Sequence, residues 1–150
     1  MPLDNVLLIL KSRPLVVAGS GALSGEESSL VGEMPGVIVL NRFISDGEMV
    51  WLFEHCICVC LPYIEASQSG VLAMAYRYGK PVIVSDLDGL TEFVDEKKSG
   101  LVFRTKEELT AELDEVARPG VAERLGAGAS AYLTEHLDWE KNVRRWLESE

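Results

Sequence analysis

The sequence lacks the long apolar segments that would place it in a membrane. No apolar run among its 150 residues approaches the roughly 20 residues needed to span a bilayer. The apolar residues of the first ten positions have no basic region ahead of them, which is atypical of a signal peptide. We therefore expect no transmembrane segment and a cytoplasmic location.

Basic residues are scarce. The chain has 14 Lys and Arg against 24 Asp and Glu, a formal net charge of −10. A surface of this sign repels phosphate backbones and anionic lipid headgroups. The composition therefore excludes nucleic acid as an expected partner, along with membrane attachment through a basic face.

Cysteine is too rare for a disulfide framework. Cys56, Cys58 and Cys60 are an odd number in one tight cluster. His55 beside them permits a metal interpretation, but on a strand residues two apart point to the same face. We expect the three cysteines to pack together in one core layer, and we expect no metal site.

The chain is rich in apolar residues, since 47% of its residues are hydrophobic. Its length suits a single domain over residues 1–150. Short apolar runs alternate with helical patterns, which predicts an α/β fold: a Rossmann-like, doubly wound parallel sheet of about five strands with helices on both faces. The strands are expected at residues 15–19, 36–40, 57–61, 81–84 and 100–103.

Helices are expected between these strands and after the last of them. Their predicted ranges are 24–34, 45–55, 69–78, a short helix near 90, 107–117, one opened by Pro119 and one beginning at Asp138. Ser45 with Glu48 matches a capping box, and Thr105 is a good helix cap. The leucines of residues 4–11 have helical spacing and predict the tail of a further helix.

The candidate site lies in residues 58–103. A predicted buried strand leads into a loop that contains Glu65, and the small residues of Ser67–Gly70 open the next helix. Helix N-termini of this kind bind phosphate, because their first amides lack partners and the helix dipole is positive there.

Other polar residues follow the ends of the predicted strands. Gly19–Gly21, Arg42 and Ser85–Asp86 each come directly after a strand, as does the Glu65 loop. Ligands of doubly wound sheets bind outside the carboxyl ends of the strands. We therefore expect these segments to converge on one cleft.

Each candidate also has a plain structural explanation. Glu65 is equally explained as a contact for sugar hydroxyls beside a diphosphate and as a solvated acid near a helix start. Gly19 and Gly21 match the start of a dinucleotide-binding fingerprint but lack its third glycine. They are explained either by a tight turn after the strand or by the close approach of a phosphate or base to the backbone. Glu92 either faces the cleft or only complements a helix dipole.

The central residues resemble those of a known family. Residues 61–103 read LPYIEASQSGVLAMAYRYGKPVIVSDLDGLTEFVDEKKSGLVF. This run is similar to the C-terminal half of the GT-B fold retaining glycosyltransferases of group 1 (family 4). Positions shared with the family's pattern are Pro62, Glu65, Gly79, Pro81, Val82, Ile83, Gly89, Glu92, Gly100, Leu101 and Val102. With the similar VVAGSG run before it and a late DWE helix, the resemblance covers nearly all of the chain.

The resemblance implies a domain that binds a nucleotide-diphosphate sugar as donor substrate, without a cofactor or metal. Glu65 is implied to be the catalytic contact to the donor sugar. Gly19 and Gly21 are implied to line the cleft floor, with Arg42 and Phe43 near the base. The amides that receive the diphosphate are implied to be those of Ser67, Gln68, Ser69, Gly70 and Val71. Glu92 is implied to be a further donor-binding residue.

Two departures from the family's pattern bear on activity. The second acid of the family's Glu-x7-Glu pair, implied to hold the ribose, is replaced by Ala73 or, counted back from Pro81, by Met74. The family's first strand, with a Gly-Arg and a nearby Lys that neutralise the diphosphate, is missing. We therefore expect the N-terminal acceptor domain to be absent, and transfer to require a separate N-terminal domain or partner chain.

Two alternatives stay open. The chain could be a non-catalytic binding or scaffold subunit of a two-chain transferase, an interpretation motivated by Ala73 and the missing basic strand. It could also be a generic Rossmann-like domain for a nicotinamide cofactor, although the missing third glycine disfavours this.

Overall fold

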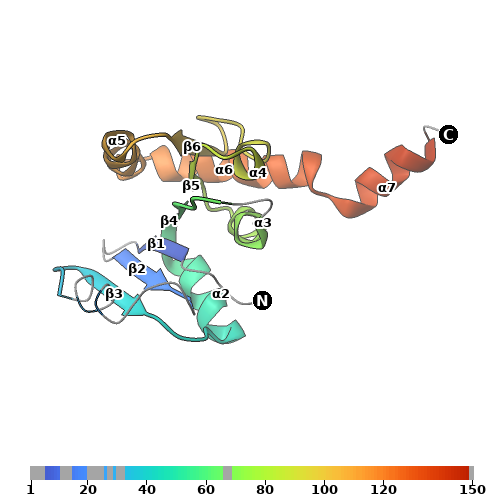
Figure 1. Cartoon of the computed structure of the whole chain (residues 1–150). Helices are drawn as coiled ribbons and strands as arrows, with labels where there is room; N and C mark the ends of the chain where they lie inside the picture. The colour runs from blue at the N-terminus through green and yellow to red at the C-terminus, as the bar shows by residue number, and fades with distance from the viewer. Residues whose placement is uncertain are drawn as a thin grey trace.

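The fold is an α/β sandwich around one sheet. The computed structural model describes residues 6–10, 15–19, 26, 29, 33–65 and 69–148. The strands in this part of the chain form a six-stranded sheet in the order β3-β2-β1-β4-β5-β6 (Figure 1). They are β1 (Val6–Leu10), β2 (Leu15–Ala18), β3 (Val37–Leu40), β4 (Cys56–Leu61), β5 (Val82–Ser85) and β6 (Gly100–Phe103).

Five of the strands run in one direction. β2 pairs with β3 in parallel, and β4, β5 and β6 pair in parallel with one another. β1 lies between β2 and β4 and is antiparallel to both, so β2 and β4 also run the same way. The predicted set of five parallel strands and the doubly wound α/β class are confirmed.

The helix expected over residues 4–11 is wrong, because residues 6–10 form the antiparallel strand β1. A short apolar run such as VLLIL fits a buried strand as well as a helix, and periodicity alone does not separate the two. Both edges of β1 are paired, and strands in the middle of a sheet commonly read as continuous apolar runs.

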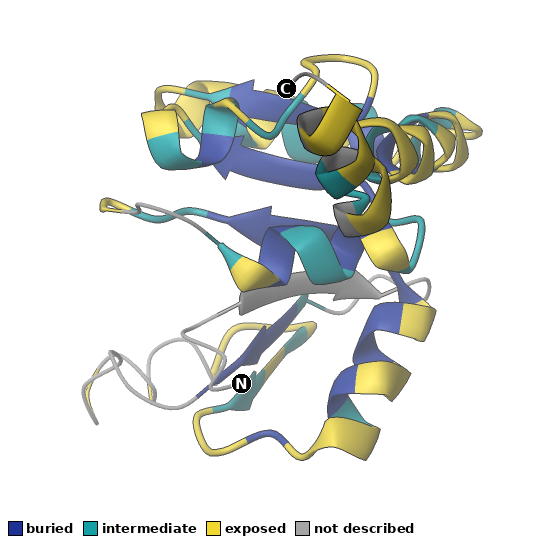
Figure 2. Ribbon diagram, turned by 90° about the vertical axis from the view of Figure 1, so that its right-hand side faces the viewer, coloured by how far each residue is buried: buried dark blue, intermediate teal, exposed yellow. Residues whose placement is uncertain are grey.

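The helices cover both faces of the sheet. They are α2 (Asp46–His55), α3 (Gly70–Arg77), α4 (Asp88–Thr91), α5 (Lys106–Val116), α6 (Val121–His136) and α7 (Trp139–Glu148). The strands β4 and β5 are largely buried, while the helices expose their outer sides (Figure 2). α7 continues beyond α6 and projects from the body of the domain (Figure 1).

Two apolar clusters make up the core. The first packs one face of the strands against α2 and α3, with Val59, Leu61, Val82, Val84, Phe53, Leu72 and Tyr76 among its buried members. The second packs the alternate strand residues against α5 and α6, and it consists of Cys58, Cys60, Ile83, Leu101, Val116 and Leu125. Because neighbouring residues of a strand point to opposite faces, the two clusters lie on opposite sides of the sheet.

The cysteines are core residues, but they do not share one layer. All three side chains are buried, as expected. Cys58 and Cys60 belong to the second cluster, whereas Cys56 belongs to the first. The pairing of β4 with β1 shifts register between Cys56 and Cys58, which breaks the alternation that the prediction assumed. The single-layer prediction is therefore wrong for Cys56.

The helix starts follow the predicted capping residues. Ser45 and Glu48 form a reciprocal capping box on α2, and the side chain of Thr105 accepts a hydrogen bond from the amide of Glu108 in α5. α6 begins later than predicted, at Val121. Gly120 is its N-cap in the left-handed conformation, a geometry that glycine adopts without strain, so Pro119 precedes the helix.

Some predictions fall partly or wholly outside the described residues. Of the residues described in the helix expected over 24–34, Glu26 and Ser29 are helical, whereas Glu33 and Met34 lie in a turn and a bend, so the predicted C-terminal end is wrong. None of the helices in the part of the chain that the structure covers is long and apolar enough to cross a membrane.

Candidate functional site

The candidate site lies along the edge of the sheet where the parallel strands end. Gly19 follows β2, Arg42 follows β3, and Pro62–Glu65 follows β4. Asp86 and Arg104 come directly after β5 and β6. Because these strands run in one direction, all five segments emerge at the same edge, as the sequence predicts.

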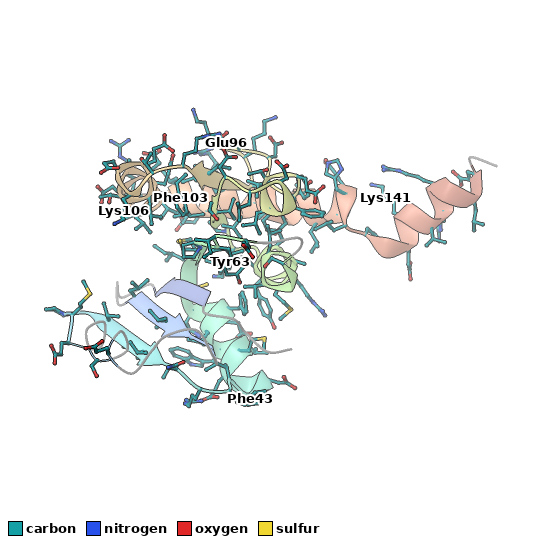
Figure 3. The ribbon with its side chains drawn as sticks, viewed as in Figure 1. Phe43, Tyr63, Glu96, Phe103, Lys106 and Lys141 are labelled. Carbon is teal, nitrogen blue, oxygen red and sulfur yellow. The ribbon has the colours of Figure 1, made fainter. Side chains whose placement is uncertain are left out.

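The strand order separates these segments into two groups. β4, β5 and β6 are direct neighbours, so the loops that follow them are adjacent. β3 lies three strand positions from β4, which at about 4.8 Å a strand corresponds to about 14 Å. The residues Arg42 and Phe43 therefore lie at the far end of this edge from the Glu65 loop, as the labels of Phe43 and Tyr63 show (Figure 3).

The loop that carries Glu65 is tied to the neighbouring strand. The hydroxyl of Ser85, the last residue of β5, donates a 2.6 Å hydrogen bond to the carbonyl of Tyr63. Beyond this anchor the loop is open to solvent, with Ile64 91% exposed and Glu65 exposed as well. Two of the predicted site residues that follow, Ser67 and Gln68, lie outside the described residues.

The N-terminus of α3 follows this loop. Ser69 is its N-cap, and the Ser69 Oγ accepts a 3.3 Å hydrogen bond from the amide of Leu72. No acidic residue occupies the first turn. Gly70 is exposed, while the side chain of Val71 is buried in the core. Helix geometry leaves the first amides of α3 without an intrahelical acceptor, so any contribution of Gly70 and Val71 to ligand binding comes from their backbone.

A cavity of about 270 Å³ opens beside this helix start, lined by Ser69, Gly70, Leu72, Ala73, Phe93 and Leu137. Ala73, one of the two positions where the family's pattern places a second acid, is part of its wall. Phe93 and Leu137 were not predicted, because they reach the cavity from segments far along the chain. Their apolar character was the only signal in the sequence, and it did not distinguish them from core residues.

Glu92 lies immediately before Phe93, at the end of α4. Its side chain is exposed, and its backbone carbonyl accepts a 3.0 Å hydrogen bond from the hydroxyl of Tyr132. The structure therefore places Glu92 next to a residue of the cavity wall.

Arg42 is engaged in an ion pair at the other end of the edge. Its guanidinium donates two hydrogen bonds to the carboxylate of Glu48, at 2.7 and 3.0 Å. Hydrogen bonding from Arg42, followed by that from Ser45, lowers the pKa of Glu48 to about 2. The neighbouring Phe43 side chain is 67% exposed. Any contact from Arg42 to a nucleotide base would have to compete with this pair, whereas the Phe43 ring is accessible.

Gly19 ends β2 in a conformation that favours glycine. Its φ is 138°, a value that L side chains rarely adopt, and its amide donates to the carbonyl of Leu40 at 3.1 Å. The glycine thus permits the backbone conformation in which β2 ends. Gly21, its predicted partner, lies outside the described residues.

A further cation lies at the same edge. The guanidinium of Arg104 pairs with the carboxylate of Asp86 at 3.1 Å, joining the ends of β5 and β6. Arg104 was not predicted as a site residue. The signal was present, because Arg104, like Asp86, is a polar residue directly after a strand. Among the residues that the structure describes, no three His, Cys, Asp or Glu side chains are grouped so that they could hold a metal ion.

Comparison with known proteins identifies the sequence family. The family described as "Glycosyl transferases group 1" matches residues 3–118. A search of curated protein sequences finds no match.

Solved structures show a common fold. TarM is 16% identical with a TM-score of 0.74, and the match covers 92% of this chain and 28% of TarM. HepE of Anabaena in complex with UDP-glucose is 16% identical with a TM-score of 0.65, covering 90% of this chain and 40% of HepE. The C-terminal domain of LpcC, a group 1 family protein of Francisella tularensis, is 13% identical with a TM-score of 0.61, covering 76% of this chain and 60% of that one. The chain spans less than two thirds of each of them. At these identities the likeness establishes the fold, which is that of the GT-B glycosyltransferases.

Proposed function

The chain belongs to the group 1 glycosyl transferases, and on this premise we propose that it is the donor-binding domain of a glycosyltransferase. Its ligand is a nucleotide-diphosphate sugar, held for retaining transfer of the glycosyl group to an acceptor. The observation that carries the proposal is the cavity at the N-terminus of α3. Its first lining residue along the chain, Ser69, comes four residues after the exposed Glu65. This cavity lies at the edge of the sheet where α/β proteins of this class bind ligands.

In this proposal each group of residues contacts a different part of the ligand. Glu65 contacts the donor sugar, and Glu92 approaches the same part of the ligand from the end of α4. The amides of Ser67, Gln68, Ser69, Gly70 and Val71 receive the diphosphate, because the helix start offers unpaired donors and a positive dipole. Gly19 and Gly21 form the floor below the nucleotide, and Arg42 and Phe43 lie on the side of the base.

Transfer needs a second half of the site. We infer that residues 1–150 form one nucleotide-sugar-binding domain, and that a separate N-terminal domain or partner chain supplies the acceptor. The similar structures are longer than this chain, which covers 28% of TarM and 40% of HepE. The isolated chain is then not competent for transfer. A cytoplasmic location remains part of the proposal.

Donor binding is tested by titrating the labelled chain with UDP-glucose and with UDP, following backbone amide signals by NMR. UDP-glucose is a suitable probe because HepE, of similar fold, was solved with it. We expect millimolar ligand to shift the amides of Ser69–Ala73 and Glu92–Phe93. Glu65→Ala is expected to weaken binding of UDP-glucose and to leave binding of UDP nearly unchanged.

The matched control is Glu107→Ala, which removes an exposed acid from the first turn of α5. This control is needed because the chain carries a net charge of −10, so the loss of any carboxylate reduces repulsion of an anionic ligand. Absence of shifts around Glu65 and Ser69 at millimolar nucleotide would contradict the proposal. Equal effects of Glu65→Ala on UDP and UDP-glucose would contradict the role of Glu65.

A non-catalytic binding or scaffold subunit of a two-chain transferase is the second candidate. The observation that favours it is Ala73 in the cavity wall, where a carboxylate for the ribose would be expected. The two candidates differ in the effect of restoring the acid. Ala73→Glu is the deciding variant. If it binds UDP-glucose at least several-fold more tightly than the unchanged chain, the alanine weakens the donor site of the unchanged chain, and this favours the scaffold role.

A further inference from the structure

Two tyrosines hold the segment that follows α4. The hydroxyl of Tyr132, from α6, donates to the carbonyl of Glu92 at 3.0 Å. The hydroxyl of Tyr76, from α3, donates to the next carbonyl, that of Phe93, at 2.8 Å. The two rings meet edge to face with their centroids 5.6 Å apart. Two helices thus bind two consecutive peptide groups of one loop.

These contacts hold the backbone on both sides of Phe93 and on one side of Glu92. Because each peptide group is planar, holding the two groups that flank Phe93 sets its φ and ψ and with them the direction of its Cα–Cβ bond, while Glu92 is held at its carbonyl. With the carbonyls of Glu92 and Phe93 turned toward the tyrosines, the Phe93 ring lines the cavity beside Ser69 and Gly70 while the Glu92 side chain is exposed.

The anchor beneath Phe93 is buried and fully bonded. Tyr76 and Ser99 are both 0% exposed, and their hydroxyl oxygens lie 2.9 Å apart. The Ser99 hydroxyl also accepts a 2.9 Å hydrogen bond from the amide of Asp95. Loss of the Tyr76 hydroxyl would leave buried groups without partners, so a change there disturbs stability as well as position.

Tyr132 offers a cleaner test. It is half-buried, and its hydroxyl donates the hydrogen bond to the carbonyl of Glu92. Burial raises the pKa of both tyrosine hydroxyls above the ordinary value, so both remain protonated donors at neutral pH. Replacement by phenylalanine removes this donor and keeps the ring contact with Tyr76.

We propose that Tyr132 is a positioning residue for the donor site, which acts by holding Glu92 and Phe93 against the cavity at the N-terminus of α3. The inference rests on the proposed function, because it assigns the effect of Tyr132 to nucleotide-sugar binding. It adds a residue from α6 that touches no part of the proposed ligand.

The test compares Tyr132→Phe with Tyr78→Phe in the full chain. Tyr78 is the matched control, since its ring stacks on Phe53 at the other end of α3. We expect Tyr132→Phe to weaken UDP-glucose binding by about threefold to tenfold, which is the effect of roughly one hydrogen bond. We expect Tyr78→Phe to bind as the unchanged chain does, and both variants to unfold at similar temperatures.

A double-mutant cycle separates positioning from a general structural effect. In a Glu92→Ala background, Tyr132→Phe is expected to cause a smaller loss of affinity than in the unchanged chain, because one of the two side chains that it positions is already gone. An undiminished loss in that background would overturn the inference, and so would unchanged affinity in the single variant.

A ligand-free measurement distinguishes failure of the inference from failure of the proposed function. Hydrogen exchange at the amides of Phe93 and Val94 is expected to be faster in Tyr132→Phe than in Tyr78→Phe. If the unchanged chain does not bind UDP-glucose, the proposed function fails. Faster exchange then still supports the anchoring by Tyr132, whereas unchanged exchange overturns it.

Discussion

The hydroxyl of Ser85 donates to the carbonyl of Tyr63 across 2.6 Å, joining the end of β5 to the loop that follows β4. The carbonyl of Leu61 lies 3.4 Å from the same hydroxyl. Tyr63 is two residues before Glu65, and the chain becomes exposed directly after it, at Ile64. Ser85 thus connects a core strand to the proposed catalytic residue.

Removal of this anchor is expected to loosen the loop. Ser85→Ala removes this hydrogen bond to the half-buried carbonyl of Tyr63, at a cost of about 1 kcal/mol in the free energy of unfolding. Urea unfolding measures this change, and hydrogen exchange at Ile64 and Glu65 should become faster. The matched control is Thr110→Ala, whose hydroxyl bonds within the exposed helix α5 and whose loss should change stability by less than about 0.5 kcal/mol. Unchanged exchange at Ile64 and Glu65 would show that Ser85 does not anchor the loop.

The start of α2 should make stability depend on pH. The pKa of Glu48 is about 2 in the folded chain, against an ordinary value of 4.5, chiefly because Arg42 and Ser45 donate hydrogen bonds to the ionised carboxylate. A lowered pKa in the folded state means that the ionised form stabilises the fold. This contribution is fully present well above pH 4.5 and is lost as the pH falls toward 2.

The variant Glu48→Gln keeps the shape of the capping box and removes the charge. We expect its deficit in stability relative to the unchanged chain to be largest near neutral pH and to shrink as the pH falls through the interval from 4.5 to about 2. Urea unfolding at a series of pH values measures it, and added salt should reduce the deficit because the pair is exposed. A deficit that grows on acidification would contradict the assignment.

Close packing of α6 on the turn after α3 should make one glycine irreplaceable. A Cβ added at Gly126 would overlap the backbone carbonyl of Gly79, which cannot rotate away as a side chain can. Gly126→Ala is therefore expected to destabilise the chain by about 1–3 kcal/mol. Gly47→Ala is the control, because a Cβ at this position in α2 meets nothing within 4 Å. Because Gly47 is the second residue of α2, in its first turn, the control is expected to be neutral or to stabilise by up to about 0.5 kcal/mol. Thermal and urea unfolding measure both, and a neutral Gly126→Ala would contradict the packing described.

Much of the fold follows from local signals in the sequence. The five parallel strands coincide with short apolar runs bounded by Gly, Pro or Ser, and each is confirmed within one or two residues. Ser45 and Thr105 cap the helices that they were expected to cap, because capping depends on residues three positions apart. The family resemblance rested on the spacing of the residues within 61–103 that are shared with the family's pattern. The match over residues 3–118 confirms the resemblance to the group 1 glycosyl transferases.

The errors have a common physical cause, which is pairing between distant segments. Whether VLLIL forms a helix or a strand depends on the partners that β2 and β4 offer, since a short apolar run suits either state. Cys56 left the layer of Cys58 and Cys60 because the ladder with β1 shifts register between them. Neither partner can be read from the residues themselves.

The same distinction holds for the candidate site. The sequence by itself indicated the residues of the proposed site: the Glu65 loop, the small residues that open α3, and Ala73 or Met74 where a second acid was expected. Only the tertiary structure decided which apolar groups enclose them. Phe93 and Leu137 meet Ser69 in one cavity, and Tyr132 reaches Glu92 across 40 residues of chain. These contacts depend on how α6 packs against α3 and α4, and packing of this kind is set by the whole core, so no local pattern encodes it.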